Sequence, residues 1–216
     1  MSKKEFVKDS IYIMRVKLVR PQIRIDNRNL FFSGQTLNLN GFDAGVLLKD
    51  KLRLTLGYYM LNHNLSAYSK NEDNVEFKRE LTLQYGSINT EFIYKSTRFF
   101  SLGMPLEFGF GNNRLQYINS STGEIQSKQS GFLLVSDFGL SATFKPIRWI
   151  GIRAVVGYRK TLYNQVKDFR FDSFFTSVGL NVDIREIVKD IQMYKLKRRY
   201  RKNSSSVATA VDLITD

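Results

Sequence analysis

His63 is the only histidine in the chain, and histidine is the side chain best suited to proton transfer near neutral pH. Ser66 follows three residues later, and the acids Glu72 and Asp73 lie further along the same polar stretch. A histidine can act as the base that activates a serine nucleophile. No catalytic motif accompanies these residues, and a histidine in a loop is usually only solvated. We therefore keep His63 and Ser66 as candidates for an acyl hydrolase or transferase, but we expect a protein that is not an enzyme.

Other kinds of chemistry lack the residues they need. The chain contains no cysteine, so it can form neither a disulfide nor a thiolate metal site. Its sequence has no phosphate-binding glycine loop, no paired metal-ligand cluster and no nucleotide fingerprint. It also has no run approaching the roughly 18 consecutive apolar residues of a membrane-spanning helix. We expect no cofactor and no metal, and any crossing of a bilayer would have to be made by strands.

The segment from Phe100 to Phe110 alternates large apolar residues with small or polar ones. The apolar residues are Phe100, Leu102, Met104, Leu106, Phe108 and Phe110, and between them stand Ser101, Gly103, Pro105, Glu107 and Gly109. Successive side chains of an extended chain point to opposite faces. The alternation therefore predicts a strand with one apolar face and one polar face.

The same alternation recurs along the chain and predicts eight strands. We place them at about 19–26, 41–48, 52–61, 77–94, 100–117, 132–144, 150–159 and 173–184. In the fourth of these, the apolar residues move from odd positions, as at Leu83, to even positions, as at Ile88. We predict a bulge near Gly86, because one extra residue would keep them all on one face.

The connections between these strands alternate in length. Three are short, near Lys49, Lys95 and Lys145, and the longer ones cover about 27–36, 63–75, 119–130 and 164–170. In an up-and-down meander, alternate connections lie at the same end. We therefore expect one end with short turns and one end with long loops, as in outer-membrane barrels.

With this pattern the chain resembles the small eight-stranded outer-membrane β-barrel proteins of the OmpA/OmpX-like group, most closely the Bacteroidota-type barrel-domain proteins. The residues that carry the resemblance are the hairpin 41–59, the strand 99–111 and the terminal strand 172–184. It implies an all-β, eight-stranded antiparallel up-and-down transmembrane barrel over 19–184, located in the outer membrane with the lipid bilayer as its partner. The long loops would then serve structural, adhesion or partner-binding roles. Among small barrels, the lipid A deacylases and palmitoyltransferases use a histidine and a serine near the outer rim, which is the enzyme alternative for His63 and Ser66.

If the apolar face contacts lipid, the charged residues of the other face must fill a narrow interior. These residues are Arg24, Asp26, Asp43, Arg53, Glu107, Asp137, Arg153, Arg159 and Asp183. Buried charges are tolerated only when they are paired, so we predict a network of ion pairs. The interior of an eight-stranded barrel is just wide enough for its own side chains, which argues against a pore.

Aromatic residues gather near the predicted strand ends, where an interfacial girdle would place them. They are Tyr58, Tyr94, Phe99, Phe144, Trp149, Tyr158 and Tyr163. The alternative is a soluble basic barrel, with the apolar face inward, that binds nucleic acid or a small ligand. Small residues on the polar face favour lipid, since a face in water would more often carry Lys and Glu. We do not expect nucleic-acid binding, because the strands carry no RNA-recognition signature.

The net charge of +13 is concentrated in the two ends of the chain. Residues 1–20 contain six basic and two acidic residues, and residues 185–202 contain eight and two. We predict a basic arm over 1–18, a basic helix over 185–202 and a loose tail to 216, and these basic tails are candidate contacts for a periplasmic or envelope protein. The first ten residues lack the apolar segment of a secretory signal. Either a signal precedes them or the protein is not exported, and we expect the former.

Overall fold

The structure, a computed structural model, describes residues 3–14, 18–32, 35–62, 65–70, 76–119, 125–166 and 171–215. The strands are β1 (Val19–Phe32), β2 (Gln35–Leu48), β3 (Leu52–Leu61), β4 (Leu65–Lys70), β5 (Glu76–Ser96), β6 (Phe100–Asn119), β7 (Ile125–Ile147), β8 (Ile150–Asn164) and β9 (Ser173–Asp183). Helix α1 (Lys3–Met14) precedes them and helix α2 (Ile184–Thr215) follows. Within these ranges no helix combines the length and the apolar character needed to span a membrane.

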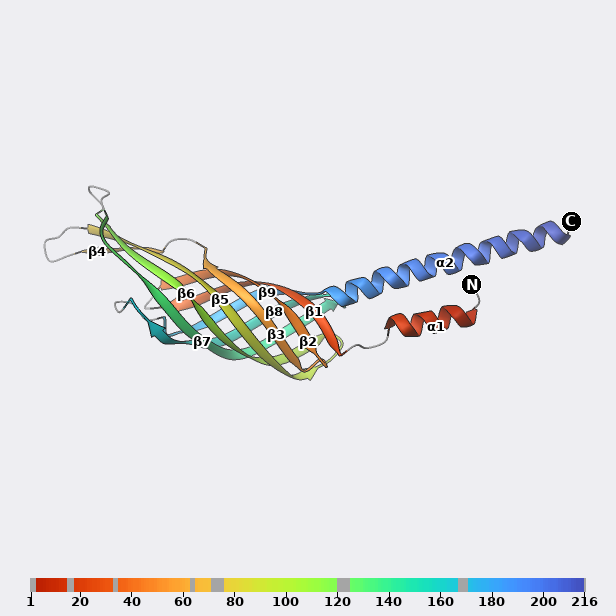
Figure 1. Cartoon of the computed structure of the whole chain (residues 1–216), viewed down its shortest axis with the longest axis horizontal. Helices are drawn as coiled ribbons and strands as arrows, with labels where there is room; N and C mark the ends of the chain where they lie inside the picture. Colours follow the sequence, from red (N-terminus) through yellow and green to blue (C-terminus); the bar gives the residue numbers. More distant parts are fainter. Residues whose placement is uncertain are drawn as a thin grey trace.

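Eight of the strands close into a ring (Figure 1). Every pairing is antiparallel, β1 pairs with β9, and β3 pairs with β5, so the sheet closes on itself. Strand β4 pairs only with the start of β5, from Leu81↔Leu65 to Glu76↔Lys70, beyond the point where β3 ends. It lengthens one wall without adding a member to the ring. The predicted eight-stranded antiparallel up-and-down barrel is confirmed.

The strands run further than predicted toward the end with the long loops, which we call the loop end. Strands β1 and β2 stay paired as far as Phe32↔Gln35, so most of the loop expected over 27–36 is strand. Strand β7 begins at Ile125, inside the loop expected over 119–130. The outward residues here are polar, Asn27 and Asn29 among them. The alternation of apolar with polar residues therefore stops although the strand continues.

Near the short turns, the outer surface of the ring is apolar. The exposed side chains there include Ile25, Phe42, Leu56, Ile88, Phe92, Met104, Leu106, Phe108, Phe138, Leu140, Val156, Val178 and Leu180, which we call the belt. Each is between 43% and 66% exposed, and together they draw on all eight strands of the ring. An apolar surface of this extent is not typical of a protein that is surrounded by water.

Beyond the belt, toward the loop end, the polarity of the two faces is reversed. In β6 the outward residues are apolar up to Phe110, after which Asn112 and Arg114 point outward and Leu115 is buried. In β5 Leu83 and Tyr85 point inward while Gln84 points outward. In β5 and β6 the wall beyond the belt is therefore polar outside and apolar inside, whereas β7, β8 and β9 still expose Phe132, Tyr163 and Phe174 there.

This reversal explains why the predicted bulge at Gly86 is wrong. Inward and outward side chains alternate without interruption through Gly86, which pairs in register with Phe110. The register between β5 and β6 shifts instead between Ile93 and Lys95. What changes at Gly86 is the polarity of the interior, and the facing of the strand stays the same.

The interior at the loop end is a compact apolar cluster. It consists of Leu30, Leu37, Leu39, Tyr59, Leu81, Leu83, Tyr85, Leu115, Leu133, Val135, Val155, Val166, Phe171 and Phe175, each at most 4% exposed. The cluster occupies the inside of the wall beyond the belt. It closes the barrel toward the loop end.

Both helices extend from the end with the short turns, which we call the short-turn end (Figure 1). Helix α2 follows β9 directly, and the Asp183 carboxylate accepts a hydrogen bond of 3.2 Å from the Glu186 amide, as an N-cap does. The helix continues to Thr215, although we expected a loose tail from Asn203. Serine lowers helix propensity only modestly, and an established helix extends easily. Helix α1 lies against α2, with the rings of Phe6 and Tyr200 4.8 Å apart.

Candidate functional site: the charged interior

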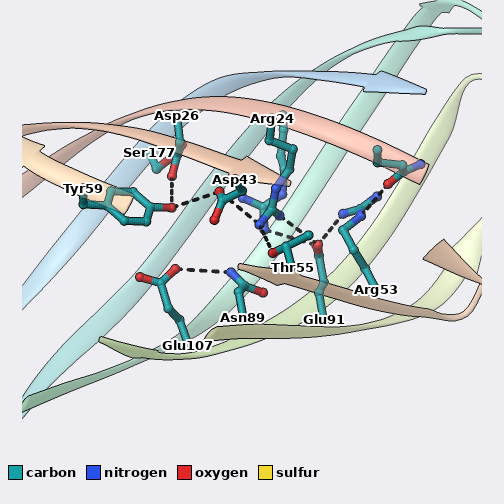
Figure 2. A network of polar contacts seen from close by, with 12 residues as sticks. Arg24, Asp26, Asp43, Arg53, Thr55, Tyr59, Asn89, Glu91, Glu107 and Ser177 are labelled. Atoms are coloured by element: carbon teal, nitrogen blue, oxygen red, sulfur yellow. Dashed lines mark hydrogen bonds and ion pairs between the residues drawn. The ribbon is translucent and has the colours of Figure 1, made fainter. Parts of the chain in front are cut away.

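A network of charged side chains fills the barrel between the short turns and the apolar cluster (Figure 2). It joins five arginines and five carboxylates, each at most 5% exposed. They are Arg24, Arg28, Arg53, Arg153 and Arg159, and Asp26, Asp43, Glu91, Glu107 and Asp137. The equal numbers allow each buried charge to have a partner of opposite sign, which is the condition for burying so many.

Glu91 is the centre of the part nearer the short turns. One of its oxygens accepts hydrogen bonds from Arg53 and, at 3.4 Å, from Arg24. The other accepts from Arg153 at 3.2 Å and from the Ser141 hydroxyl. A single carboxylate thus contacts three guanidinium groups from three different strands, of which Arg24 also pairs with Asp43 at 3.2 Å.

Arg28 is the centre of the part nearer the apolar cluster. Its two terminal nitrogens donate to the Glu107 carboxylate at 3.1 and 3.0 Å, and they also contact Asp137 and Asp26. Its guanidinium lies over the Tyr59 ring, 4.4 Å from the ring centre. Arg28 therefore ties three acidic residues together.

A layer of tyrosines separates the charges from the apolar cluster. The rings of Tyr59 and Tyr85 are stacked 5.2 Å apart. The Tyr59 hydroxyl donates to Asp26 at 3.1 Å, and Tyr85 accepts a hydrogen bond from Arg159. Arg159 also donates two hydrogen bonds, of 2.7 and 2.6 Å, to the Asp137 carboxylate. The hydroxyls satisfy the polar side of the layer while the rings complete the apolar side.

The structure brings together all nine charged residues that the sequence singled out, with Asp183 at the margin. The Asp183 carboxylate accepts a hydrogen bond of 3.3 Å from Gln22, which in turn accepts one of 2.8 Å from Arg53. Sequence reasoning missed Arg28 and Glu91, the two centres of the network. Arg28 fell in a predicted loop, whereas Glu91 lay on the polar face of the predicted strand 77–94 but was not singled out.

Little open space remains within the network. A cavity of about 10 Å³, lined in part by Arg28, Asn89, Glu107 and Arg153, has room for about one water molecule. The charges therefore hold one another, and the interior forms a plug. The arrangement can rigidify the barrel, but it does not present a reactive group to a substrate.

The close approach of Tyr59 to Gly41 leads to a first prediction. A Cβ atom at position 41 would overlap the Tyr59 ring, which cannot move away because it is held between Arg28 and Tyr85. We expect Gly41→Ala to lower the free energy of unfolding by about 1–3 kcal/mol, the usual effect of overpacking. Urea titration of the folded fraction measures the change.

Gly86→Ala is the matched control for this prediction. There a new Cβ would meet the Phe110 ring at 3.5 Å and the Gly57 carbonyl at 3.9 Å, both ordinary contacts. An equal loss of stability in the two variants would contradict the claim that the Tyr59 packing makes position 41 special.

The predicted interfacial aromatics lie on the outer surface toward both ends of the belt. Near the short turns are Tyr94, Phe99, Phe144 and Trp149, and in the halves of β3 and β8 away from those turns are Tyr58, Tyr158 and Tyr163. Five of them are 42–54% exposed, while Trp149 and Tyr158 are half-buried. The candidate catalytic residue His63 lies outside the described residues, and so does the side chain of Ser66, whose backbone belongs to β4.

The chain matches no protein-family model, and no curated protein is significantly similar to it in sequence. Among solved structures it is similar to a major outer membrane protein from Thermus thermophilus, with 10% identity and a TM-score of 0.50 over 75% of this chain and 98% of that one. It is also similar to the N-terminal β-barrel domain of Pseudomonas aeruginosa OprF, with 15% identity and a TM-score of 0.49 over 78% and 98%. For Neisserial surface protein A the identity is 15% and the TM-score 0.46, over 77% and 97%. At 10% identity the similarity to the Thermus protein shows the fold alone, which is that of an outer-membrane β-barrel.

Proposed function

We propose that this protein is a non-enzymatic barrel of the outer membrane. It would present the loops of its loop end on the side of the bilayer opposite the short turns. The observation that carries the proposal is the belt, an exposed apolar surface that draws on all eight strands of the ring while charges are buried inside. This is the inverse of a water-soluble protein and is typical of a barrel in lipid.

The buried network supports a barrel that does not conduct. The five arginines and five carboxylates bond to one another, and the cavity among them measures only about 10 Å³. The apolar cluster lies beyond them, toward the loop end. A solute could cross the barrel only by disrupting both the charged network and the apolar cluster.

The wall beyond the belt supports a role for the loops in adhesion or partner binding. Its outer surface is polar along β5, β6 and part of the β1–β2 hairpin, where a ladder of hydrogen bonds joins Asn38 to Asn27 and Asn29 at 2.7 to 3.0 Å. Its apolar filling makes it rigid, so the loops would be carried above the membrane on a firm base. Placement among Bacteroidota-type barrels is supported by the strand pattern alone.

The helical arm supports a contact on the opposite side of the membrane. Helix α2 has 32 residues and, at 1.5 Å per residue, is about 48 Å long. Its exposed basic residues are Lys195, Lys197, Arg198, Arg199 and Arg201. In the usual orientation of such barrels the short turns face the periplasm. The arm would then offer its positive charge to an acidic envelope protein.

The proposal is tested by reconstitution of the whole chain. We expect the protein to need detergent or lipid for solubility and to migrate differently on gels before and after boiling, because a closed barrel resists unfolding by the gel detergent. In planar bilayers the folded form should produce no steady conductance. Solubility without detergent together with unchanged mobility on boiling would refute membrane insertion, and a stable open channel would refute the plug.

A further inference from the structure

We propose that a groove on the rim of the short-turn end binds the phosphate group of an anionic phospholipid. The groove has a volume of about 340 Å³. Arg98 and Phe99 line it from the β5–β6 turn, residues 145–148 from the β7–β8 turn, and Asp190 from α2. This inference rests on the proposed function, since a lipid reaches the rim only if the barrel lies in a membrane.

The two turns are held together by the sheet, so the groove is preformed. The Lys145 amide donates a hydrogen bond of 2.6 Å to the Phe99 carbonyl. The Thr97 amide closes its own turn by donating to the Phe100 carbonyl at 2.7 Å. Just outside the groove, the rings of Phe100 and Phe144 lie 5.0 Å apart. A ligand would therefore find its partners already in position.

The groove carries an excess of positive charge that the protein does not neutralise. Arg98, Lys145 and Arg148 line it, against the single carboxylate of Asp190. None of these three cations forms an ion pair anywhere in the described part of the chain. Elsewhere on the same rim Arg20 contacts Asp50 and, at 3.6 and 3.8 Å, Asp183 and Glu186. The groove is thus a place where basic residues gather without acidic partners.

Apolar side chains lead from the groove onto the belt, and they identify the occupant. Phe99, Phe100, Phe144 and Ile147 are between 42% and 55% exposed along this path. Guanidinium groups bind phosphate through paired hydrogen bonds. An anion that also carries acyl chains satisfies both surfaces, whereas free phosphate satisfies only the first. The fitting ligand is a phospholipid of the leaflet at the short-turn end.

The test compares lipid retention by the full-length protein and its variants in nanodiscs of phosphatidylcholine with graded fractions of phosphatidylglycerol. Native mass spectrometry counts the bound phosphatidylglycerol after mild release from the disc. A basic residue at an anionic membrane surface contributes about a fivefold change in affinity. We expect Arg98→Gln or Arg148→Gln to weaken retention about fivefold each, and the triple variant with Lys145→Gln to weaken it about 100-fold.

Two further variants separate this site from general charge. Asp190→Asn should strengthen retention, because it removes the one negative charge in the groove. Lys51→Gln removes an exposed cation from the β2–β3 turn at the same end but outside the groove, so it should weaken retention less than Arg98→Gln does. Added inorganic phosphate should not displace the lipid, since it cannot replace the apolar contacts.

Retention of phosphatidylglycerol by the triple variant at the wild-type level, or an equal loss in Lys51→Gln, would overturn the inference. If the triple variant did not fold, the single variants at the exposed turn residues Arg98 and Arg148 would decide the question. A wild-type protein that inserts, shifts on boiling and shows no preference for phosphatidylglycerol would refute the groove alone. A wild-type protein that does not insert would refute the proposed function itself.

Discussion

Replacing Glu91 by glutamine should lower the free energy of unfolding by about 3–5 kcal/mol, the usual cost of removing one partner from a buried ion pair. The side chain keeps its shape but loses the negative charge that faces Arg24, Arg53 and Arg153. Those guanidinium groups cannot reach water, because each is at most 5% exposed. Urea titration in phospholipid vesicles measures the loss, with the folded fraction read from the gel shift of unboiled samples.

Glu186→Gln is the matched control, since it makes the same chemical change at the rim. Glu186 pairs with Lys189 at 2.7 Å in the first turn of α2, where the two side chains are 13% and 10% exposed. Water reaches both side chains in part, so this variant should lose less stability than Glu91→Gln. A loss in Glu91→Gln no larger than in Glu186→Gln would mean that the interior network does not hold the barrel together.

A second comparison tests whether stability depends on the pairing of the buried charges or on their number. Adding Arg153→Met to Glu91→Gln removes one of the two cations that the first change leaves without an ion pair, since Arg24 keeps its pair with Asp43. Pairs of buried charges that are removed together usually cost less than one partner removed alone. We expect the double variant to be more stable than Glu91→Gln, although it has lost one more ionic group.

The sequence predicted the barrel well where each strand alternates apolar and polar residues. That condition holds along β6 from Phe100 to Phe110, where the outward side faces the belt and the inward side holds Glu107. Period-two alternation states directly which residues share a face. The nine predicted interior charges follow from it, because all nine lie on stretches of this kind.

The prediction from sequence failed where the environment of the two faces of a strand changes. At Gly86 the interior passes from polar to apolar and the exterior from apolar to polar, so a straight strand looked bulged and Leu83 and Tyr85 were turned to the wrong face. At Asn27 the outward residues become polar, so β1 was ended before Arg28. A pattern of alternating apolar residues distinguishes the two faces of a strand, but it does not show which face lies inside the barrel. Only the closed ring supplies that information.

Placing an arginine at the middle of the belt should destabilise the protein by about 2–4 kcal/mol, whereas placing one beyond the belt should cost at most about 1 kcal/mol. Leu106→Arg and Asn112→Arg make this comparison on the same face of β6, six residues apart. Leu106 is 43% exposed within the apolar stretch, and Asn112 is exposed where the outer face has become polar. The single tryptophan, Trp149, reports unfolding by fluorescence in vesicles.

The comparison distinguishes the two environments because exposure alone predicts no difference. If the outer face of β6 were in water, an arginine at either position would change stability by no more than about 0.5 kcal/mol. A large loss at position 106 with a small one at position 112 requires lipid around the first and water around the second. Equal and small effects would show that the belt does not face lipid. Equal and large effects would mean that lipid extends beyond Asn112. That result would contradict the inference that the polar outer face of β6 lies in water.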